Sequence, residues 1–563
     1  MEGLSVKVAD YVVEFLHDKG YELVFGLPGW NILALYDALR SSGTEHMLFR
    51  HENSAAVAAD VYGRLTGRPG VCIVTAGPGA TNSVTGVAGA YSASSPMIHM
   101  AGHCSRSEAL QPFHGVDDWF FLEKMFRPIT KFSKTLIRAS EVPEVLEKAY
   151  RTSVRGRPGP VHVSLPTDLL EEELEAVKKS SGEGEELGCA HNDLERVVNY
   201  AIKILPRSTK PIVIAGLGVL RTFTWGAVED LTRRINAPVL VTRWGRSAVD
   251  PASPLSLDYV SLTPFRDVHP LIREIIEESD LVISIGLEAG SRRLLEESVK
   301  DVPMLHVYQW DGCPELVVGP RSIEIRSPSL RRILELLHRG LERCFTATRW
   351  GDVKNRVAKV REVIERELRN FAEQYSGAKP LHPSYVLKVL RDVAEENAIV
   401  TLDVGDNMVW AETFFRVRRP NSLLSPGRFG AMGFSLPAAI AAKKILGERQ
   451  VLAITGDGGM LMVLGELATL AEQKLGVKVV VLNDGRYGML WKAQRDRFSG
   501  RFIAVDTHPP NFAKCARLYG ICSVKVSDPR ELKPALEDVL SDEAPALIDV
   551  AVASHYEYYP YVV

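Results

Sequence analysis

A glycine-rich turn in the last third of the chain carries an aspartate between an apolar run and a helical pattern. The turn is Gly456-Asp457-Gly458-Gly459, and a second apolar run, Val477–Leu482, ends at Asn483. Glycines let backbone N–H groups approach a phosphate closely, and a following helix N-terminus favours the same anion. Asp457 and Asn483 supply hard oxygen ligands of the kind that Mg²⁺ prefers. The two motifs together predict a metal-bound diphosphate site, whereas the glycine turn alone is a weak signal.

A glutamate in the first third of the chain is placed for acid–base chemistry. Glu52 belongs to the segment RHEN, residues 50–53, which follows a strand-like run and precedes a helical pattern. One interpretation is a carboxylate that stabilises a helix N-terminus. The other is a general acid–base group whose pKa is tuned by burial. These residues alone leave both interpretations open.

Short buried strands that alternate with helices must position these residues. Runs of about four to eight residues rich in Val and Ile are typical of strands buried on both faces. Their alternation with helical patterns predicts parallel sheets and an α/β fold. The expected strands are Val71–Thr75, Pro96–Ala101, Val161–Leu165, Ile212–Ala215, Val239–Thr242, Leu281–Ile285, Met304–Tyr308, Ile399–Val404, Val451–Thr455, Val477–Leu482 and Ala546–Val550.

Two segments have the composition of linkers and divide the chain. The first, Glu171–Asp193, is charged and contains Gly and Ser; the second runs from about Thr346 to Pro383 and includes a charged helical pattern. They predict three doubly wound domains, over residues 1–175, 190–345 and 375–555. Each is close to the usual domain size of about 100–150 residues.

Composition excludes several classes of protein. The formal net charge of −3 gives no sign of a nucleic-acid partner or an anionic membrane surface. No apolar stretch reaches the roughly 18 residues of a membrane span. The first residues form an amphipathic pattern with acidic side chains rather than a signal peptide. The 7 cysteines contain no CxxC pair, which argues against a disulfide framework and favours a reducing, cytoplasmic location.

Taken together, the motifs resemble those of thiamine-diphosphate (ThDP) enzymes, in the branch of the acetolactate synthase catalytic subunit and pyruvate oxidase. The resemblance rests on GDG followed by Asn, on RHEN, on TAGPGATN at 75–82 and on RFGAMGF at 428–434. Longer segments, such as NDGRYGMLWKAQRDRFSGR from residue 483, extend it over nearly the whole chain.

The resemblance implies a role for each matching residue. Glu52 would contact N1′ of the pyrimidine and promote the imino tautomer that takes the C2 proton. Gly430 would accept a hydrogen bond from the 4′-amino group, and Met432 would keep the cofactor bent. The predicted catalytic residues are therefore Glu52 and His114. Mg²⁺ would be held by Asp457, Asn483 and the Gly485 carbonyl. The residues predicted to hold the cofactor are Pro78, Asn82, Asn407, Gly430, Met432, Gly456, Asp457, Gly458, Gly459, Asn483 and Gly485.

Three departures from the synthase pattern concern specificity. Trp30 stands where those synthases keep a small residue and would narrow the space above the thiazolium. His114 replaces a glutamine; it is either a proton shuttle near neutral pH or a surface histidine. The middle domain has glycine turns at 216–218 and 242–245, but SIGLEAGSRR replaces the FDDR segment. These residues therefore leave open whether the middle domain binds FAD as an additional cofactor.

The sequence thus predicts a ThDP- and Mg²⁺-dependent enzyme of 2-oxo acids, of the acetolactate synthase type, which decarboxylates pyruvate and adds the fragment to a second 2-oxo acid. The alternatives are a 2-oxo acid decarboxylase, a 2-hydroxyacyl lyase and an FAD-linked pyruvate oxidase. A cofactor-binding protein without catalysis would not need Glu52. Because Glu52 and Asp457 lie in different domains, the resemblance implies a homodimer or homotetramer with sites at the subunit interface, with a regulatory subunit as a further candidate partner.

Overall fold

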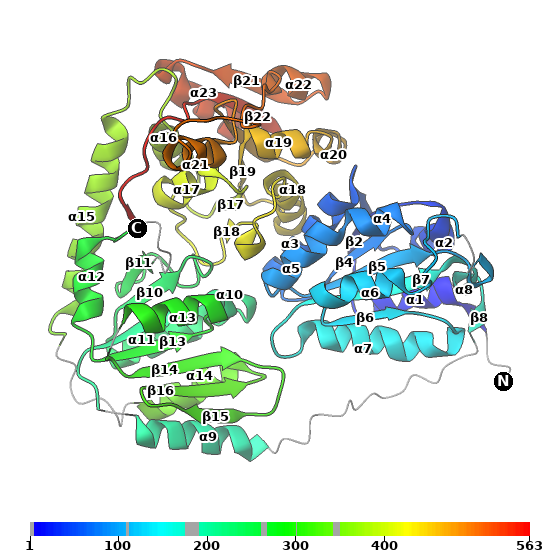
Figure 1. Ribbon diagram of the computed structural model, residues 1–563, viewed down its shortest axis with the longest axis horizontal. Helices are drawn as coiled ribbons and strands as arrows, with labels where there is room; N and C mark the ends of the chain where they lie inside the picture. The colour runs from blue at the N-terminus through cyan, green and yellow to red at the C-terminus, as the bar shows by residue number, and fades with distance from the viewer. Residues whose placement is uncertain are drawn as a thin grey trace.

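Three α/β units, each built on its own sheet, form the chain in a computed structural model (Figure 1). The structure describes residues 5–108, 112–174, 191–205, 207–260, 267–299, 301–341 and 350–562. Every strand expected from the sequence is present, and the α/β class is confirmed. The first and third sheets share one strand order, and the middle sheet has another.

The first domain has a six-stranded parallel sheet in the order β3-β2-β4-β5-β7-β6. Helices cover both faces, since the apolar side chains divide into two clusters, one on each side of the sheet. The strands are β2 (Leu23–Leu27), β3 (Glu45–Leu48), β4 (Gly70–Val74), β5 (Met97–His103), β6 (Phe132–Thr135) and β7 (Pro160–Pro166), and the main helices are α1 (Val8–Asp18), α2 (Leu33–Ser41), α3 (Glu52–Thr66), α5 (Val84–Ser92) and α7 (Val142–Val154).

The third domain repeats this order as β18-β17-β19-β20-β22-β21, again with parallel pairs only. Its strands are β17 (Ile399–Leu402), β18 (Leu423–Leu424), β19 (Val451–Gly456), β20 (Val477–Asn483), β21 (Cys522–Val526) and β22 (Ala546–Ala551). Its helices are α16 (Pro383–Val393), α17 (Asp406–Phe414), α18 (Ser435–Leu446), α19 (Asp457–Met462), α20 (Glu466–Gln473), α21 (Gly488–Arg497), α22 (Phe512–Leu518) and α23 (Pro529–Ser541).

The middle domain has a seven-stranded sheet in the order β11-β10-β9-β13-β14-β16-β15. It is parallel except for the edge strand β15, which pairs antiparallel with β16. Its strands are β9 (Pro211–Ala215), β10 (Val239–Thr242), β11 (Ser256–Val260), β13 (Leu281–Ile285), β14 (Met304–Gln309), β15 (Glu315–Val318) and β16 (Ser322–Ser327). Its helices include α9 (His191–Ile204), α10 (Leu217–Arg221), α11 (Trp225–Ile235), α12 (Pro270–Glu277), α13 (Ala289–Ser298) and α14 (Leu330–Gly340).

The segment predicted as the second linker is mostly the helix α15 (Val353–Glu373), which runs along the middle and third domains (Figure 1). Its buried residues, among them Val357 and Ile364, belong to one apolar cluster with both sheets. The connection is therefore part of the packed core. Most of the first predicted linker, residues 175–190, lies outside the described residues, and the domain boundaries stay predictions.

The first and third domains pack directly on each other within the chain. Helix α3 lies against α18 (Figure 1), and Arg64 Nη1 donates to the carbonyl of Ser425 at 2.6 Å. Arg64 also forms a buried ion pair with Asp60 at 2.5 Å. In the described part of the chain no helix is long and apolar enough to cross a membrane. Cys313 is disulfide-bonded, a bond that the sequence did not predict.

Candidate active site

A cavity of about 250 Å³ opens at the carboxyl ends of the third-domain strands. Ligands bind at this edge of open parallel sheets. The structure brings together here 7 of the predicted cofactor residues: Asn407, Gly430, Met432, Gly456, Asp457, Gly458 and Gly459.

A buried and a half-buried carboxyl group, Asp457 and Asp484, meet on one wall of this cavity. Asp457 is the first residue of α19 and is 1% exposed; its Oδ2 accepts a hydrogen bond from the Thr507 hydroxyl. Burial, together with the adjacent charges of Asp457 and Asp406, raises the pKa of Asp484 to about 8. Burial also raises the pKa of Asp457. A cation bound beside this pair would offset the repulsion. Asp484 was not among the predicted residues, although it directly follows Asn483.

Thr507 connects two of the predicted metal ligands. Its backbone N–H donates to the Gly485 carbonyl at 2.9 Å, while its hydroxyl donates to Asp457. Asn483 ends β20 and donates from Nδ2 to Asp549 Oδ1 at 2.9 Å, which fixes its amide. Within the described ranges, no three His, Cys, Asp or Glu side chains form a metal cluster. A cation here would therefore depend on amide, carbonyl and ligand oxygens.

The glycines of the turn are required by close packing. A Cβ atom on Gly458 would lie 2.6 Å from Tyr487 Cε1 and 3.1 Å from Met432 Cε. A Cβ atom on Gly459 would lie 2.7 Å from the carboxyl carbon of Asp403. Only glycine, which has no Cβ atom, fits at both positions.

Asp403, which the sequence analysis did not single out, holds the segment that follows Met432. Its carboxyl group is buried at the end of β17 and accepts from the backbone N–H of Gly433 at 3.0 Å. Burial raises the pKa of Asp403 to about 6. The predicted phosphate contact Asn407 is held in turn, since its Nδ2 donates to the Asp403 carbonyl at 2.8 Å.

Asp406 has partners of its own beside the predicted phosphate site. The Lys492 ammonium donates to Asp406 Oδ2 at 2.9 Å, and the Tyr558 hydroxyl donates to Oδ1. Lys492 also lies 4.0 Å from the centre of the Tyr558 ring. The negative charge of Asp406 is therefore balanced by an ion pair, which explains how it lies next to a site for an anion.

The first domain assembles the second group of predicted residues at its own strand ends. Glu52 begins α3 and is 8% exposed. Asn82 Nδ2 donates to Glu52 Oε2 at 3.0 Å, and a Cβ atom on Gly79 would lie 3.4 Å from Glu52 Oε1. Pro78 begins the short helix α4 (Pro78–Asn82) that carries both neighbours. The carboxyl group is thus held against the turn that the sequence predicted.

Two residues that depart from the synthase pattern flank this same turn. A Cβ atom on Gly77 would lie 2.4 Å from the carbonyl oxygen of His114, so the His114 backbone rests on the turn. The indole of Trp30 is 73% exposed, and its neighbour Gly29 packs on Thr75. The His114 backbone and the segment that carries Trp30 therefore lie beside the turn that holds Glu52.

The Glu52 group (Glu52, Pro78 and Asn82) does not line the cavity of the Asp457 group, which is lined by third-domain residues. Large apolar side chains are exposed around both groups: Trp30 and Phe113 in the first domain, Met462, Met489 and Leu490 in the third. Exposed apolar patches of this kind mark surfaces that another molecule covers.

A further cavity, of about 410 Å³, lies at the strand ends of the middle domain. Glu288 on its wall accepts from the Leu217 N–H at 3.0 Å through Oε1, and its buried Oε2 has no hydrogen-bond partner among the described residues. A Cβ atom on Gly218 would lie 2.8 Å from Gly286 Cα. The glycine turns are therefore needed for backbone packing, whether or not a ligand binds.

The class of protein follows from matches to three family descriptions. "Thiamine pyrophosphate enzyme, N-terminal TPP binding domain" matches residues 6–121, the central domain of the same family matches 198–309, and its "C-terminal TPP binding domain" matches 403–550. The chain belongs to the family of thiamine pyrophosphate (ThDP) enzymes. The Glu52 group lies in the first matched range and the Asp457 group in the third.

Within that family the chain is similar to acetolactate synthases. It is 31% identical, over 97% of its length and 92% of the relative, to a probable acetolactate synthase large subunit of Methanococcus aeolicus. It is 29% identical to an acetolactate synthase of Arthrospira platensis, over 98% and 95% of the two chains. It is 28% identical to the acetolactate synthase isozyme 1 large subunit of Escherichia coli, over 98% and 95%.

Proposed function

We propose that this protein is a ThDP- and Mg²⁺-dependent acetolactate synthase, which decarboxylates pyruvate and joins the resulting fragment to a second 2-oxo acid. The observation that carries the proposal is the placement of Glu52, which is buried, hydrogen-bonded by Asn82 and held against the Pro78 turn. A protein that only bound the cofactor would have no use for a carboxyl group there. The similarity to synthases over nearly the whole chain supports the choice of reaction.

Glu52 is proposed to act as the acid–base group. ThDP, when bound, supplies a carbon nucleophile that attacks the carbonyl group of a 2-oxo acid. The Glu52 carboxyl would hold a proton at N1′ of the pyrimidine, and Asn82 would keep that carboxyl in one orientation. His114, whose backbone rests on the same turn, is proposed as a second group that moves protons near neutral pH.

Asp457, Asn483 and the Gly485 carbonyl are proposed to hold Mg²⁺, with Thr507 as the residue that positions two of them. The donor set fits a hard cation because it consists of oxygen atoms. A bound cation would also favour the ionised form of Asp484, whose pKa burial and Asp457 raise to about 8. Gly458 and Gly459 line the cavity, where their backbone would approach the diphosphate closely. Met432 would then lie against the rings, as the family resemblance implies.

A complete site is proposed to need two copies of the chain, in a homodimer or a homotetramer. The Glu52 group and the Asp457 group occur in different domains and do not line one cavity, and both are bordered by exposed apolar side chains. Because several relatives are named large subunits, a smaller regulatory partner is proposed as well. The location is proposed to be cytoplasmic, as the sequence indicates.

FAD is proposed as the occupant of the middle-domain cavity. The buried Glu288 Oε2 needs a donor, and a hydroxyl group of a nucleotide or flavin would provide one. The test is the visible absorbance of the purified protein, before and after incubation with FAD and removal of excess ligand. Absence of bound flavin under both conditions would remove FAD from the assignment without affecting ThDP.

The decisive experiment is a screen of 2-oxo acids with ThDP and Mg²⁺ in which every product is identified. With pyruvate we expect acetolactate. Acetaldehyde as the main product would indicate a decarboxylase, and acetate formed with consumption of an electron acceptor would indicate an oxidase. Either result would replace the proposed reaction while leaving the cofactor assignment in place.

A further inference from the structure

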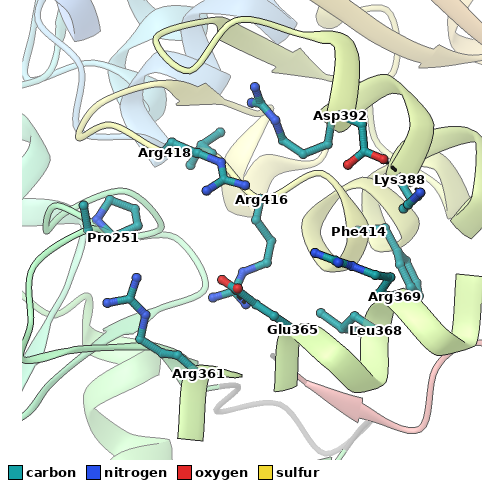
Figure 2. A pocket seen from close by; sticks show the side chains of 13 residues that line it. Pro251, Arg361, Glu365, Leu368, Arg369, Lys388, Asp392, Phe414, Arg416 and Arg418 are labelled. Atoms are coloured by element: carbon teal, nitrogen blue, oxygen red, sulfur yellow. Dashed lines mark ion pairs between the residues drawn. The ribbon is translucent and has the colours of Figure 1, made fainter. Parts of the chain in front are cut away.

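A third cavity, of about 160 Å³, gathers an unusual number of cationic side chains between the middle and third domains. We call it the arginine pocket; its cations are Arg361, Arg369, Lys388, Arg391, Arg416 and Arg418. Figure 2 shows Arg361, Arg369, Arg416 and Arg418 extending toward one space from different directions. Only two carboxylates, Glu365 and Asp392, line the same space.

The carboxylates nearby neutralise only part of this charge. Lys388 pairs with Glu373 at 2.6 Å and with Asp392 at 2.9 Å, and Glu365 lies 3.9 Å from Arg416. The four other cations, Arg361, Arg369, Arg391 and Arg418, have no carboxylate oxygen within 4.0 Å among the described residues. Four uncompensated guanidinium groups around one small space repel one another and attract an anion.

Arg391 is the observation that distinguishes a binding site from a charged surface. Its side chain is only 8% exposed. One nitrogen, Nη2, donates to the carbonyls of Ala394 and Glu395 at 2.6 and 2.5 Å, but Nε and Nη1 are buried without a partner among the described residues. Buried donors without partners are rare and costly.

An ordinary structural role accounts for only part of this arrangement. Arg391 lies in the last turn of α16, where a cation stabilises the terminal carbonyl groups, and it also packs over the Phe415 ring at 4.7 Å. That role uses Nη2 and the face of the guanidinium. It leaves Nε and Nη1 unexplained, and it does not require Arg361, Arg369 and Arg418 to converge on the same cavity.

The arginine pocket is connected to the cofactor cavity by two helices. Pro383 and Asp406, the first residues of α16 and α17, line the cavity at Asp457, which we call the cofactor cavity. Arg391 and Phe414, at the other ends of these helices, line the arginine pocket. The two helices pack against each other. The 9 residues of α17 separate the sites by about 14 Å, so an occupant of one site can shift the end of a helix at the other.

We propose that the arginine pocket binds a small phosphate-class anion, inorganic phosphate or a phosphate monoester, as a regulatory ligand whose binding is coupled to ThDP binding through α16 and α17. Guanidinium forks match phosphate oxygens in pairs. The cavity is smaller than the roughly 300–1,000 Å³ typical of sites for larger organic ligands, which favours a compact ion over a nucleotide.

Calorimetric titration of the ThDP- and Mg²⁺-loaded protein at constant ionic strength tests the site. Inorganic phosphate, a simple phosphate monoester and malonate serve as probes, and the loaded cofactor keeps phosphate out of the diphosphate site. We expect phosphate or its ester to bind, and the exposed-residue variants Arg369→Ala and Arg418→Ala to weaken it by about tenfold or more. Arg419→Ala, an exposed neighbour outside the pocket, is the control and should bind like the wild type.

Three results would overturn the assignment: no phosphate binding, equal loss in the control variant, or malonate binding as tightly as phosphate. The monoester arm separates a metabolite ligand from free phosphate. Coupling is tested by measuring ThDP affinity with and without the anion; the change should disappear in Arg418→Ala and persist in Arg419→Ala. Because binding is measured without turnover, its failure would leave the proposed reaction untouched.

Discussion

The first and third domains share one strand order, yet they place different chemistry at the corresponding strand end. After β4, the segment Thr75-Ala-Gly-Pro opens an uncharged turn, and Glu52, the carboxylate proposed for catalysis, comes from the helix after the edge strand β3. After β19, the segment Thr455-Gly-Asp-Gly puts the carboxylate of Asp457 in the turn itself. The scaffold therefore fixes where ligands can bind, and a few turn residues decide which part of a ligand each domain receives.

The two domains also stabilise their carboxyl groups in different ways. Glu52 is buried with one side-chain donor, Asn82. Asp457 is buried beside a second carboxyl, Asp484, whose pKa is raised to about 8 by burial and by Asp457. An isolated buried carboxyl group suits proton transfer, whereas a close pair suits a cation. The following variants separate these roles.

The largest expected effect is at the third-domain carboxylate. Asp457→Ala should abolish Mg²⁺-dependent ThDP binding, because the charged metal ligand is lost. The measurement is the thermal shift produced by ThDP with Mg²⁺. Asp538→Ala, on an exposed face of α23, is the matched control. An unchanged ThDP affinity in Asp457→Ala would show that the metal site lies elsewhere.

Glu52→Gln should separate catalysis from binding. The amide keeps the shape of the side chain and one acceptor, so ThDP should bind within roughly tenfold of the wild type, while turnover falls by about a hundredfold or more. Exchange of the ThDP C2 proton for deuterium, followed by NMR, should slow in parallel. Glu45→Gln, at an exposed carboxylate, is the control. Wild-type C2 exchange in Glu52→Gln would exclude Glu52 as the activating group.

Mixing the two inactive variants tests whether the domains work across a subunit interface. If a site combines Glu52 of one copy with Asp457 of another, a mixed dimer of Glu52→Gln and Asp457→Ala contains one intact site. Random exchange of subunits should then restore about a quarter of wild-type turnover. The assay is activity after co-refolding or co-expression, with light scattering to establish the assembly. No recovery in confirmed mixed dimers would place both groups of one site in a single chain.

The smallest expected effect concerns pH and the third domain alone. Burial raises the pKa of Asp403 to about 6. At pH values between the ordinary aspartate pKa and about 6, the folded protein therefore keeps a proton that the unfolded chain releases. The resulting stabilisation is complete at low pH and is lost as pH rises through about 6, by on the order of 1–3 kcal/mol. Thermal unfolding from about pH 4 to pH 7 should show this slope in the wild type, and Asp403→Asn should reduce it. An unchanged slope would exclude Asp403 as its source.

Much of the architecture could be predicted from local patterns. The Val- and Ile-rich runs identified strands such as β4, β19 and β20, because a strand buried on both faces has few polar residues. Edge strands such as β15, which is partly exposed, were not predicted. The charged pattern of α15 indicated a helix correctly, but its short repeat of buried apolar residues did not show that it packs against two sheets.

The site was predictable where its residues adjoin in sequence or recur in a known motif. Glu52, Pro78 and Asn82 are brought together as expected, and most of the third-domain group lines one cavity. Thr507 and Asp403 were not predicted, since their roles arise from contacts with residues about 50 and 30 positions away. Asp406 adjoins the predicted phosphate contact Asn407 in sequence, but its compensation by Lys492 needed the structure.

The sequence by itself determined the buried strands, the turn residues and the chemical groups at the strand ends, because these depend on side-chain type and on neighbours in the chain. Only the tertiary structure decided which distant groups meet. It placed Asp484 against Asp457, Thr507 between Asp457 and Gly485, and unpaired arginines from three segments around one cavity. The physical reason is that charge, burial and hydrogen bonding depend on distance in space, and that distance is set by how sheets and helices pack rather than by the order of residues.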